Sequence, residues 1–397
     1  MTSDNFTIIG GGLVGLATAW RILQRAPKAK VVLLEKEAGV GRHQSTHNSG
    51  VLHCGLHYRP GSYKARLAVA GVRQMVQFCR ENDVPHDVCG KLVVATDEGQ
   101  VKRLRGLHER GTANGLTGLR WMEPMEFRKI EPHAAGLAAL HVPEEGIVNY
   151  EKVVEALARK IQELGGTIVT DSKVTASKRR GNEWVLDTPR GEVTAKFIIN
   201  CAGLHSDRVC RSAGETTELR TVAFRGEYYR LKADRQGLVR NLIYPTPDPQ
   251  FPFLGVHFTR LMRGGVEAGP NAVLAFAREG YRFTQVNPRD LTEFLTFSGL
   301  WRFLWQHRKM CAFEFAQSLS KDRFCRTLQR LVPDLRPDDL ETGGSGVRAQ
   351  AMMPDGKLVE DFNFVRVDGA LHVLNAPSPA ATSSLAIAEH IVTQLQA

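Results

Sequence analysis

The sequence predicts an α/β protein in which a Rossmann-like dinucleotide-binding domain is interrupted by a mixed-sheet α+β domain. Three observations support this prediction. A short apolar strand near the N-terminus runs into a glycine-rich turn and a helix, helices and strands alternate through the first half, and the stretch from Leu219 to about Arg289 is rich in strands. Because the chain visits a second sheet and then returns, we expect discontinuous domains with a ligand-binding cleft between them.

The opening segment carries the strongest motif. From Asn5 to Lys36 the chain reads as a strand, the turn Gly10-Gly11-Gly12-Leu13-Val14-Gly15, a helix, and a second strand that ends at Glu35. The glycines at 10, 12 and 15 permit a tight turn, close approach of the backbone to a pyrophosphate, and close helix–strand packing. The helix from Leu13 turns its N–H groups and positive dipole end toward that phosphate. Glu35 is placed to accept hydrogen bonds from a ribose 2′-OH and would repel the 2′-phosphate of NADP.

The rest of the first half alternates in the same way. Gly39–Gly50 reads as a loop rich in Gly, Ser and His. Helices are predicted over Tyr63–Asn82, Glu98–Asn114, Met122–Pro132 and Glu151–Leu164. Strands are predicted over Val51–Cys54, Lys91–Ala95, Thr167–Val174, Trp184–Asp187 and Val193–Asn200, the last two forming a hairpin that rejoins the first domain.

The second half moves to a second sheet and back. Strands are predicted over Glu227–Leu231, Leu238–Tyr244, Phe253–Thr259 and Ala272–Phe276, then two helices before Val332, strands over Val347–Met353 and Leu371–Leu374, and a final helix over about Ala380–Gln396. We therefore expect the nucleotide-binding domain to comprise residues 1–85, 146–215 and 340–397. Residues 86–145 and 216–339 would form the substrate-binding domain.

The composition is that of an ordinary soluble enzyme with a basic surface. The 397 residues are 43% hydrophobic and 24% charged, and the net charge is +10. Such a charge fits an anionic substrate, an anionic membrane surface or nucleic acid. The scattered arginines, without a basic tail or an aromatic–basic repeat, make nucleic acid the weakest of the three. The seven cysteines form no CxxC pair, which favours reduced thiols in a cytoplasmic protein and argues against a metal site or a disulfide framework.

We expect neither a signal peptide nor a transmembrane helix. The first strand begins almost at the N-terminus, and no apolar run reaches the roughly 20 residues that cross a bilayer. Phe294–Lys309 is ambiguous, because it combines apolar and aromatic residues with Arg302, Arg308 and Lys309. A helix of this kind can lie in a membrane interface, which would place the protein peripherally on the inner face of the membrane. The interpretation we favour is a helix whose apolar stripe packs on its own domain.

Three later segments extend the dinucleotide motif. Phe197–Asp207 is a buried strand that ends in the small residues Ala202 and Gly203, where a backbone can approach a long cofactor. Gly343–Gln350 is a second glycine-rich stretch. Asn375–Ser384 is a loop of small residues that opens the last helix, a terminus suited to the oxygens of an anion or a ring carbonyl. Together with the opening motif, they frame a cofactor longer than a nicotinamide dinucleotide.

With these segments in view, the chain resembles the glycine/D-amino-acid oxidase-like family of FAD-dependent oxidoreductases over nearly its whole length. Within that family it most resembles the L-2-hydroxyglutarate oxidase/dehydrogenase subset. The more specific blocks of the resemblance are Ser45–Ser62, Pro252–Arg260, Gly269–Val273, Gly346–Gln350 and Pro377–Ser384. The resemblance implies bound FAD and the oxidation of L-2-hydroxyglutarate to 2-oxoglutarate, with hydride passing to flavin N5 and electrons passing on to oxygen or a membrane quinone.

The resemblance also implies where the cofactor contacts lie. Glu35, followed by Lys36, would face the adenosine ribose, Val174 the adenine, and the Gly10–Gly15 turn the pyrophosphate. Ser, Thr and Asn side chains suit pyrophosphate and ribitol, which need short neutral donors and acceptors. The residues expected at the FAD are Gly10, Gly12, Leu13, Val14, Gly15, Glu35, Lys36, Ser45, Thr46, His47, Asn48, Val174, Ala202, Gly203, Gly346, Arg348, Ser378, Pro379, Ala380, Ala381 and Thr382. Lys36 by itself would otherwise read as a surface residue.

The chemistry directs attention to the histidines that flank the expected flavin. Oxidation of a 2-hydroxy acid removes a hydroxyl proton, and histidine suits this step because its ordinary pKa lies near neutral pH. The candidates for the base are His53, His57 and His257; we favour His57 or His257, and the sequence does not decide between these two. His53 lies on the same strand face as His57 and is expected at the substrate. Some relatives attach the flavin covalently near the position of His53, which stays an open alternative.

A dicarboxylate substrate needs fixed cations, preferably arginine, whose guanidinium binds a carboxylate with two hydrogen bonds. Arg348, near the expected flavin, is the first candidate and is grouped with the catalytic residues. Arg225, Arg260, Tyr58 and Tyr244 are further candidates at the substrate. No metal is expected. The alternatives are a related flavoenzyme acting on an amine, an amino acid or glycerol 3-phosphate, a non-catalytic FAD sensor, and a nucleic-acid-binding protein.

Overall fold

A computed structural model describes residues 5–248 and 254–396, and its first layer is a mostly parallel sheet. The sheet holds, in spatial order, β20 (Asn363–Val367), β21 (Ala370–Asn375), β13 (Phe197–Asn200), β1 (Asn5–Ile9), β2 (Lys30–Leu34) and β9 (Thr167–Val169). Parallel strands of this kind are buried on both faces, and all residues of β1 and β13 except the first of each are accordingly buried. The Rossmann-like sheet predicted from the sequence is therefore confirmed.

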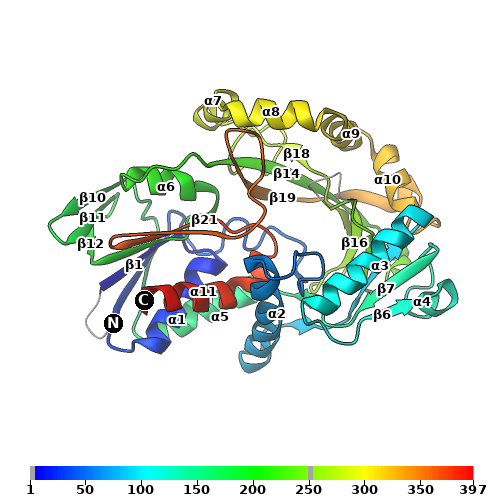
Figure 1. Cartoon of the computed structure of the whole chain (residues 1–397), viewed down its shortest axis with the longest axis horizontal. Helices are drawn as coiled ribbons and strands as arrows, with labels where there is room; N and C mark the ends of the chain where they lie inside the picture. Colours follow the sequence, from blue (N-terminus) through cyan, green and yellow to red (C-terminus); the bar gives the residue numbers. More distant parts are fainter. Residues whose placement is uncertain (1–4, 249–253, 397) are drawn as a thin grey trace.

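Helices cover one face of this sheet. The helix α1 (Leu13–Arg25) packs against α11 (Ala380–Gln396) and α5 (Tyr150–Glu163), and α11 packs in turn against α2 (Tyr63–Glu81). Figure 1 shows these four helices together beneath the sheet. On the other side lie the antiparallel strands β10 (Ala176–Arg180), β11 (Glu183–Thr188) and β12 (Gly191–Ala195) and the helix α6 (Ser206–Ser212). Residues from both ends of the chain thus build one nucleotide-binding layer.

A second, nine-stranded sheet forms the other half of the molecule. Its spatial order is β18 (Val273–Leu274), β14 (Arg220–Leu231), β17 (Val266–Gly269), β16 (His257–Arg260), β15 (Leu242–Pro245), β5 (Lys91–Ala95), β7 (Ala138–Val142) and β6 (Arg120–Met122), with β19 (Leu340–Met352) paired to β14. The helices α3 (Glu98–Ala113) and α4 (Pro124–Ile130) pack on β5–β7. Three short strands, β3 (Val51–Leu52), β8 (Gly146–Val148) and β4 (His86–Asp87), form a small sheet of their own.

Several strands differ from the sequence prediction. The strand expected to begin at Glu227 already begins at Arg220, because β14 pairs with β19 along almost its whole length. The hairpin expected over Trp184–Asn200 is divided, since β12 pairs with β11 while β13 joins β1 in the first sheet. Of the strand expected over Phe253–Thr259, the first residue lies outside the described residues, and the strand that is described begins at His257.

The strand β19 bears on the domain boundaries. It begins at Leu340, the point at which we expected the chain to return to the nucleotide-binding domain, yet its partner is β14 of the second sheet. The chain rejoins the first sheet at β20 and β21. We therefore propose that the last crossing between the two domains lies after Met352 rather than at residue 340.

Between residue 288 and Val332 the chain forms four helices instead of the two expected. They are α7 (Pro288–Leu295), α8 (Ser298–Gln306), α9 (Arg308–Ser318) and α10 (Lys321–Gln329). The amphipathic segment expected to be one helix is thus interrupted near Phe297 and His307. Phe294, Phe297 and Leu300 pack in a core with β14 and β19, as expected for a helical segment whose apolar stripe packs on its own domain. Across the described ranges 5–248 and 254–396, no helix is both long and apolar enough to span a membrane.

Candidate active site

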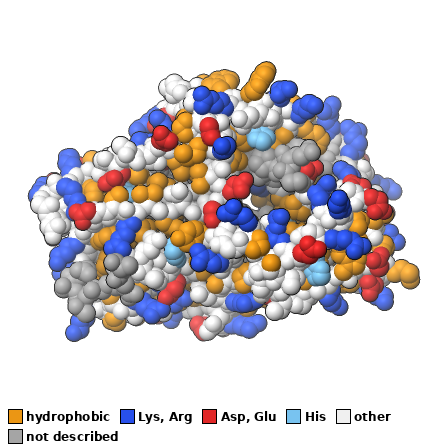
Figure 2. All heavy atoms as spheres, viewed as in Figure 1, with side chains coloured by type: hydrophobic (Ala, Val, Ile, Leu, Met, Phe, Trp, Pro, Cys, Tyr) orange, Lys and Arg blue, Asp and Glu red, His pale blue; other side chains and the backbone are white. Residues whose placement is uncertain are grey.

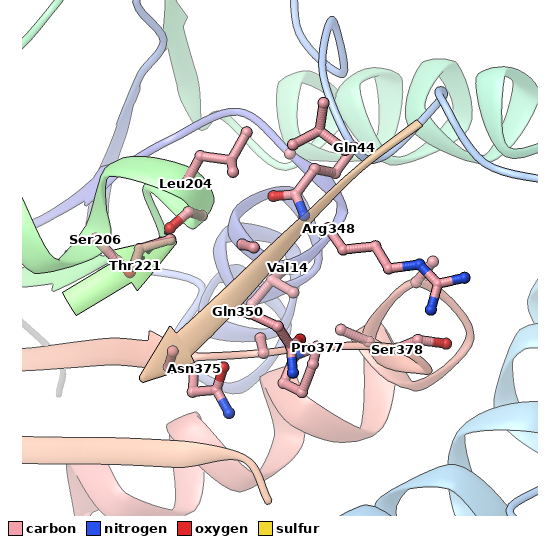
Figure 3. Close-up of a pocket in the computed structure, with 18 of the residues that line it drawn as sticks. Val14, Gln44, Leu204, Ser206, Thr221, Arg348, Gln350, Asn375, Pro377 and Ser378 are labelled. Atoms are coloured by element: carbon pink, nitrogen blue, oxygen red, sulfur yellow. Dashed lines mark hydrogen bonds between the residues drawn. The ribbon is translucent and has the colours of Figure 1, made fainter. Parts of the chain in front are cut away.

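A cavity of about 1480 Å³ lies between the two sheets and takes lining residues from both. At one end it is bordered by the Gly10–Val14 turn, Glu35 and Val174 of the first layer. At the other end it is bordered by His53, His257 and Arg348. Figure 3 shows how segments distant in sequence converge there: Val14 on α1, Leu204 and Ser206 near α6, Arg348 and Gln350 on β19, and Asn375, Pro377 and Ser378 before α11.

The glycine turn at the first end fits a long cofactor. Gly10 has a φ of +111°, and a Cβ on it would lie 2.5 Å from the carbonyl oxygen of Cys201, so only glycine fits against the end of β13. A Cβ on Gly15 would lie 2.0 Å from the carbonyl oxygen of Gly10, which explains the close packing of helix on strand. Gly10, Gly12, Leu13 and Val14 line the cavity, whereas Gly15 lies behind them. The backbone thus leaves room for a ligand at the N-terminus of α1.

Glu35 is held rigidly beside this turn. Its side chain is 7% exposed and accepts hydrogen bonds from the backbone N–H of Gly11 at 2.7 Å and of Glu37 at 2.9 Å. The carboxylate is therefore fixed at the cavity wall, next to Val174, as an acceptor for sugar hydroxyls. Lys36 also lines the cavity, but its ammonium lies 2.8 Å from Glu279 and forms a further ion pair with Glu37.

The loop expected to run along the cofactor supplies three of its four residues. Ser45, His47 and Asn48 line the cavity, and Ser45 Oγ accepts a hydrogen bond at 2.9 Å from the backbone N–H of Leu13. Thr46 is not among the lining residues, because its hydroxyl donates inward to the carbonyl of Gly41 at 2.6 Å. Ser45 thus links this loop to the start of α1 through a hydrogen bond.

The remaining small-residue segments also reach the cavity. Ala202, Gly203, Gly346 and residues 378–382 all line it. A Cβ on Gly346 would lie 2.7 Å from the carbonyl oxygen of His47, which brings β19 against the 45–48 loop. Thr382 is 1% exposed and its hydroxyl lies 2.9 Å from the hydroxyl of Tyr150. The start of α11 is therefore anchored from below while it faces the cavity.

The histidines expected to act as the base lie at the second end, where His257 is buried and His57 is half-buried. Burial, with the charge of Lys91, lowers the pKa of His57 to about 3. Burial also lowers the pKa of His257 to about 3, with contributions from the charges of Arg348 and His53. His257 stacks on the ring of Tyr244 at 3.8 Å between centroids, and its Nδ1 lies 2.9 Å from the carbonyl oxygen of Gly255, which requires Nδ1 to be the donor. Both histidines are neutral at physiological pH.

His53 has a different environment. Its Nδ1 lies 3.4 Å from Oε2 of Glu145, and the same carboxylate oxygen lies 2.7 Å from the ammonium of Lys91. Lys91 and Glu145 are each 1% exposed. Although burial alone would raise the pKa of the Glu145 carboxyl, the charges of Lys91 and His53 hold it well below its ordinary value. His53 thus contacts a carboxylate that is ionised over the whole physiological range.

Arg348 and two tyrosines complete this end of the cavity. Arg348 and Ser378 extend to the same side in Figure 3, and both line the cavity. Tyr58 and Tyr244 line it as well. Burial raises the pKa of both phenols above the ordinary value, so they remain neutral donors. The arrangement can bind an anion at Arg348, donate hydrogen bonds from tyrosines, and take a proton at a histidine.

Arg225 and Arg260 were expected at the substrate, but the structure does not bring them to the cavity. Arg225 is 1% exposed and its guanidinium lies 3.0 Å from Glu227, with which it shares a face of β14. Arg260 forms an ion pair with Asp87 of β4. Neither is among the residues that line the cavity, and each is paired with a carboxylate of the protein.

Lys91 and Glu145 are the site residues that sequence reasoning missed. The sequence predicts only a strand over Lys91–Ala95 and indicates no role for Glu145. One signal was present: Leu92 to Ala95 are apolar, so a lysine at the head of this buried strand requires a partner. The identity of that partner depends on a tertiary contact that no spacing in the sequence reveals.

Known proteins resemble the chain over nearly its whole length. The profile of the family described as FAD dependent oxidoreductase, abbreviated DAO, matches residues 5–394. The L-2-hydroxyglutarate dehydrogenase of Indibacter alkaliphilus is 50% identical over 381 residues, which cover 96% of each chain. The L-2-hydroxyglutarate dehydrogenase of Escherichia coli K12 is 44% identical, covering 99% of this chain and 93% of that protein. The mitochondrial L-2-hydroxyglutarate dehydrogenase of Homo sapiens is 40% identical, covering 100% and 89%.

Solved structures confirm the fold. The FAD-bound L-α-glycerophosphate oxidase of Mycoplasma pneumoniae superposes with a TM-score of 0.82 at 21% identity, covering 100% of this chain and 96% of that one. Glycine oxidase of Geobacillus kaustophilus superposes with a TM-score of 0.70 at 17% identity, covering 100% and 95%. The profile match spans both sheets and every lining segment of the cavity. The chain therefore belongs to the DAO family of FAD dependent oxidoreductases, and FAD is the cofactor that its glycine turn and fixed Glu35 accommodate.

Proposed function

We propose that this protein oxidises L-2-hydroxyglutarate to 2-oxoglutarate. The observation that supports this most directly is the union, in one cavity, of a glycine turn shaped for a dinucleotide, an arginine and a histidine held by a buried carboxylate. Relatives that are 40–50% identical over almost the entire chain are named for this substrate. The basic balance of the chain, with 52 Lys and Arg against 42 Asp and Glu, suits a dianionic substrate.

Each residue at the second end of the cavity has a task in this proposal. Arg348 binds a substrate carboxylate through its paired N–H donors. Tyr58 and Tyr244 donate neutral hydrogen bonds to carboxylate or hydroxyl oxygens. The glycine turn, Ser45 and Glu35 would hold the FAD, which when bound supplies the acceptor for the hydride from C2. Low exposure of Tyr244 and His257, 1% and 6%, keeps water away from the reacting carbon.

His53 is the base that the geometry favours over His57 and His257. A base must hold the proton it removes, and the conjugate acids of the other two histidines are disfavoured, since each has a pKa of about 3. Oε2 of Glu145 lies 3.4 Å from Nδ1 of His53, so a proton taken up by this ring would place a positive charge beside an anion. Removal of the hydroxyl proton by His53 leaves the substrate oxygen free to form the ketone as C2 gives up its hydride. His57 and His257 would then shape the cavity as neutral rings.

Anaerobic spectroscopy tests the proposal. The purified protein should be yellow, and its flavin absorbance should bleach on addition of L-2-hydroxyglutarate. The same anaerobic bleaching assay is run with four alternative substrates: D-2-hydroxyglutarate, glycerol 3-phosphate, glycine and proline. Bleaching by one of these and not by L-2-hydroxyglutarate would assign the protein to a different substrate. Comparison of oxygen and quinone analogues as oxidants of the reduced protein then identifies the acceptor class.

We further propose that the protein docks peripherally on an anionic membrane through α8 and α9. Trp301, Trp305, Phe313 and Phe315 on these helices and Leu319 directly after α9 are 48–71% exposed, and we call them the α8–α9 ridge. Figure 2 shows hydrophobic side chains projecting at the upper edge, where Figure 1 places α8, with Lys and Arg beside them. Arg308 stacks over Trp305 at 5.0 Å, so the ring lies next to a cation suited to lipid phosphate. A quinone acceptor would be reached from such a position.

Flotation with liposomes tests docking. Wild-type protein should float with vesicles that contain phosphatidylserine, less with neutral vesicles, and less at high salt because charge attraction is screened. The Trp301→Ser/Trp305→Ser variant should float several-fold less. The control is Met125→Ser/Leu137→Ser, which removes two side chains of 82% and 44% exposure from the opposite end of the second sheet. Equal flotation of the two variants and the wild type would remove the ridge as the docking surface.

A further inference from the structure

We propose that the buried Lys91–Glu145 ion pair is a positioning device that holds His53 in its proton-accepting tautomer and supports the positive charge it acquires. The inference rests on the proposed function, because it takes His53 as the base. Neither Lys91 nor Glu145 would itself touch the reacting atoms. Both are positioning residues, and His53 is the residue through which they act.

The geometry fixes the carboxylate from several sides. Lys91 begins β5, Glu145 lies directly before β8, and His53 lies directly after β3. Oε2 of Glu145 lies 2.7 Å from Lys91 Nζ and 3.4 Å from His53 Nδ1. Oε1 accepts from the backbone N–H of Cys54 at 3.4 Å and from its thiol at 3.3 Å. The carboxylate therefore cannot turn away from His53 without losing its other partners.

Fold stability does not explain the pair. Lys91 heads a strand whose other residues, Leu92 to Ala95, are all apolar and buried, and its ammonium lies 4.8 Å from the centre of the Tyr244 ring. Transfer of two charges out of water costs more than their attraction commonly returns, and an apolar pair would fill the same space with no such cost. A buried ion pair in contact with a half-buried histidine at a cavity wall is the arrangement that tunes proton transfer.

The tautomer follows from the contact. A carboxylate oxygen only accepts, so the 3.4 Å contact of His53 Nδ1 with Oε2 of Glu145 favours the tautomer that carries its proton on Nδ1. The lone pair is then on Nε2, on the far side of the ring. In the proton transfer, the O–H bond of the substrate breaks and an N–H bond forms at Nε2. The proton on Nδ1 stays in place, and the imidazolium lies between the ketone product and the ionised carboxylate.

The other charged and titratable groups around His53 make the carboxylate necessary. Arg348 and Lys91 are cations, His57 and His257 are neutral rings, and Tyr244 contributes a neutral phenol whose ring lies 6.3 Å from His53. Lys91, whose ammonium shares Oε2 of Glu145 with His53, opposes a positive charge on that ring. Glu145 offsets this cation, so removal of Glu145 makes the surroundings of the base more positive and removal of Lys91 makes them more negative.

The pH dependence of kcat/KM tests this opposition. Glu145→Gln should move the acid limb of the profile to lower pH by about one unit and lower the plateau at least tenfold, because the base becomes weaker. Lys91→Met should move the same limb to higher pH, because the carboxylate loses its competing cation. The control is Glu144→Gln, which removes the adjacent carboxylate from its partly exposed pair with Arg73 and should leave the limb in place. Limbs that stay within about 0.3 unit in both variants, or that move in the same direction, would overturn the proposal.

A readout without turnover separates this inference from the substrate assignment. Nitrogen-15 histidine spectra of the FAD-bound protein, assigned with His53→Gln, should show His53 protonated on Nδ1 in the wild type and mixed tautomers in Glu145→Gln. If L-2-hydroxyglutarate fails to bleach the flavin but this tautomer pattern holds, the proposed substrate fails and the positioning device stands. If His53 is protonated on Nε2 in the wild type, the device fails whatever the substrate. Should Lys91→Met not fold, Glu145→Gln and the spectra still decide the question.

Discussion

The two ends of the cavity are built by different means. At the end expected to hold the adenosine and pyrophosphate, the contacts come from backbone geometry: the positive φ of Gly10, the close packing at Gly15 and a carboxylate held by two N–H groups at Glu35. Behind the other end lie side-chain charges removed from water: the ion pair of Lys91 and Glu145, each 1% exposed, stands behind the lining residue His53. Binding a cofactor that stays in place needs shape, whereas moving a proton needs charges whose balance can change.

Because of this difference, substitutions at the two ends should impair different properties of the protein. A change at the glycine turn should reduce flavin retention, and any flavin that still binds should react normally. A change at the His53 end should leave flavin content intact and slow the chemistry. The predictions below test whether the ends separate in this way.

The largest effect is expected for His53→Gln. Loss of a general base typically costs 10²–10⁴-fold, so kcat with L-2-hydroxyglutarate should fall by roughly that factor. The ratio of flavin absorbance to protein absorbance should equal that of the wild type, because His53 belongs to the charged end of the cavity. His57→Gln, treated identically, should cost less than tenfold. If His57→Gln proves the more damaging, the assignment of the base is reversed.

The next effect is expected for Gly15→Ala at the opposite end. The added Cβ would lie 2.0 Å from the carbonyl oxygen of Gly10, so the turn must open and the start of α1 must shift. We expect FAD affinity, measured by fluorescence quenching on reconstitution, to fall about 10²-fold, equivalent to about 2.7 kcal/mol. Gly106→Ala is the control, since nothing described lies within 4 Å of the position of its Cβ. Undiminished affinity in Gly15→Ala would remove the steric basis of the comparison.

The first end was predictable from sequence, whereas at the second end the sequence identified lining residues such as His53, His257 and Arg348 but not the ion pair behind them. The opening turn and Glu35 lie within one βαβ unit, where chain connectivity fixes their relation in space, and the structure places them together as expected. Arg225 could have been excluded as well, because Glu227 is two residues away in a strand and hence on the same face. The pairing of Lys91 with Glu145 depends on how β5 and the small β3–β8–β4 sheet approach each other, which no local pattern encodes.

The amphipathic segment shows the same limit at the level of secondary structure. Its apolar spacing correctly predicted helix and a buried stripe, but the sequence did not show that the segment divides into α7, α8 and the start of α9. The division turns Trp301 and Trp305 outward, at 54% and 71% exposure, while Leu300 and Phe303 face the core. The periodicity therefore predicted a helix with an apolar stripe, and tertiary packing decided which apolar side chains meet solvent.

A smaller effect concerns pH and stability at the charged end. The pKa of His257 is lowered by burial to about 3, below the ordinary value of 6.5 in the unfolded chain. Between these values the unfolded state binds a proton that the folded state does not, so the free energy of unfolding falls as pH falls. The loss is about 1.4 kcal/mol per pH unit for this residue. Urea unfolding at pH 6 and pH 5, with FAD in constant excess, measures how much the free energy of unfolding falls per pH unit. In His257→Phe, which keeps a ring against Tyr244, this fall should be smaller than in the wild type by about 1.4 kcal/mol per pH unit.

The smallest effect expected is a change in substrate affinity at Lys64. This residue lines the cavity with its ammonium 5.1 Å from the centre of the Tyr58 ring, and burial lowers its pKa to about 8. Below pH 8 the ammonium is charged and attracts a dicarboxylate. Above pH 8 it becomes neutral, so KM should rise about threefold between pH 7 and pH 9, a magnitude typical of a partly screened charge.

Two variants determine whether Lys64 is responsible. Lys64→Arg stays charged over this range and should make KM independent of pH between 7 and 9, whereas Lys64→Met should fix KM at its higher value. Measurement of kcat in the same experiments separates binding from chemistry, because Lys64 should leave kcat unchanged while the Glu145 variants change it. If KM rises equally in all three proteins, another group is titrating, and the charged end of the cavity then extends no further than His53, Lys91 and Glu145.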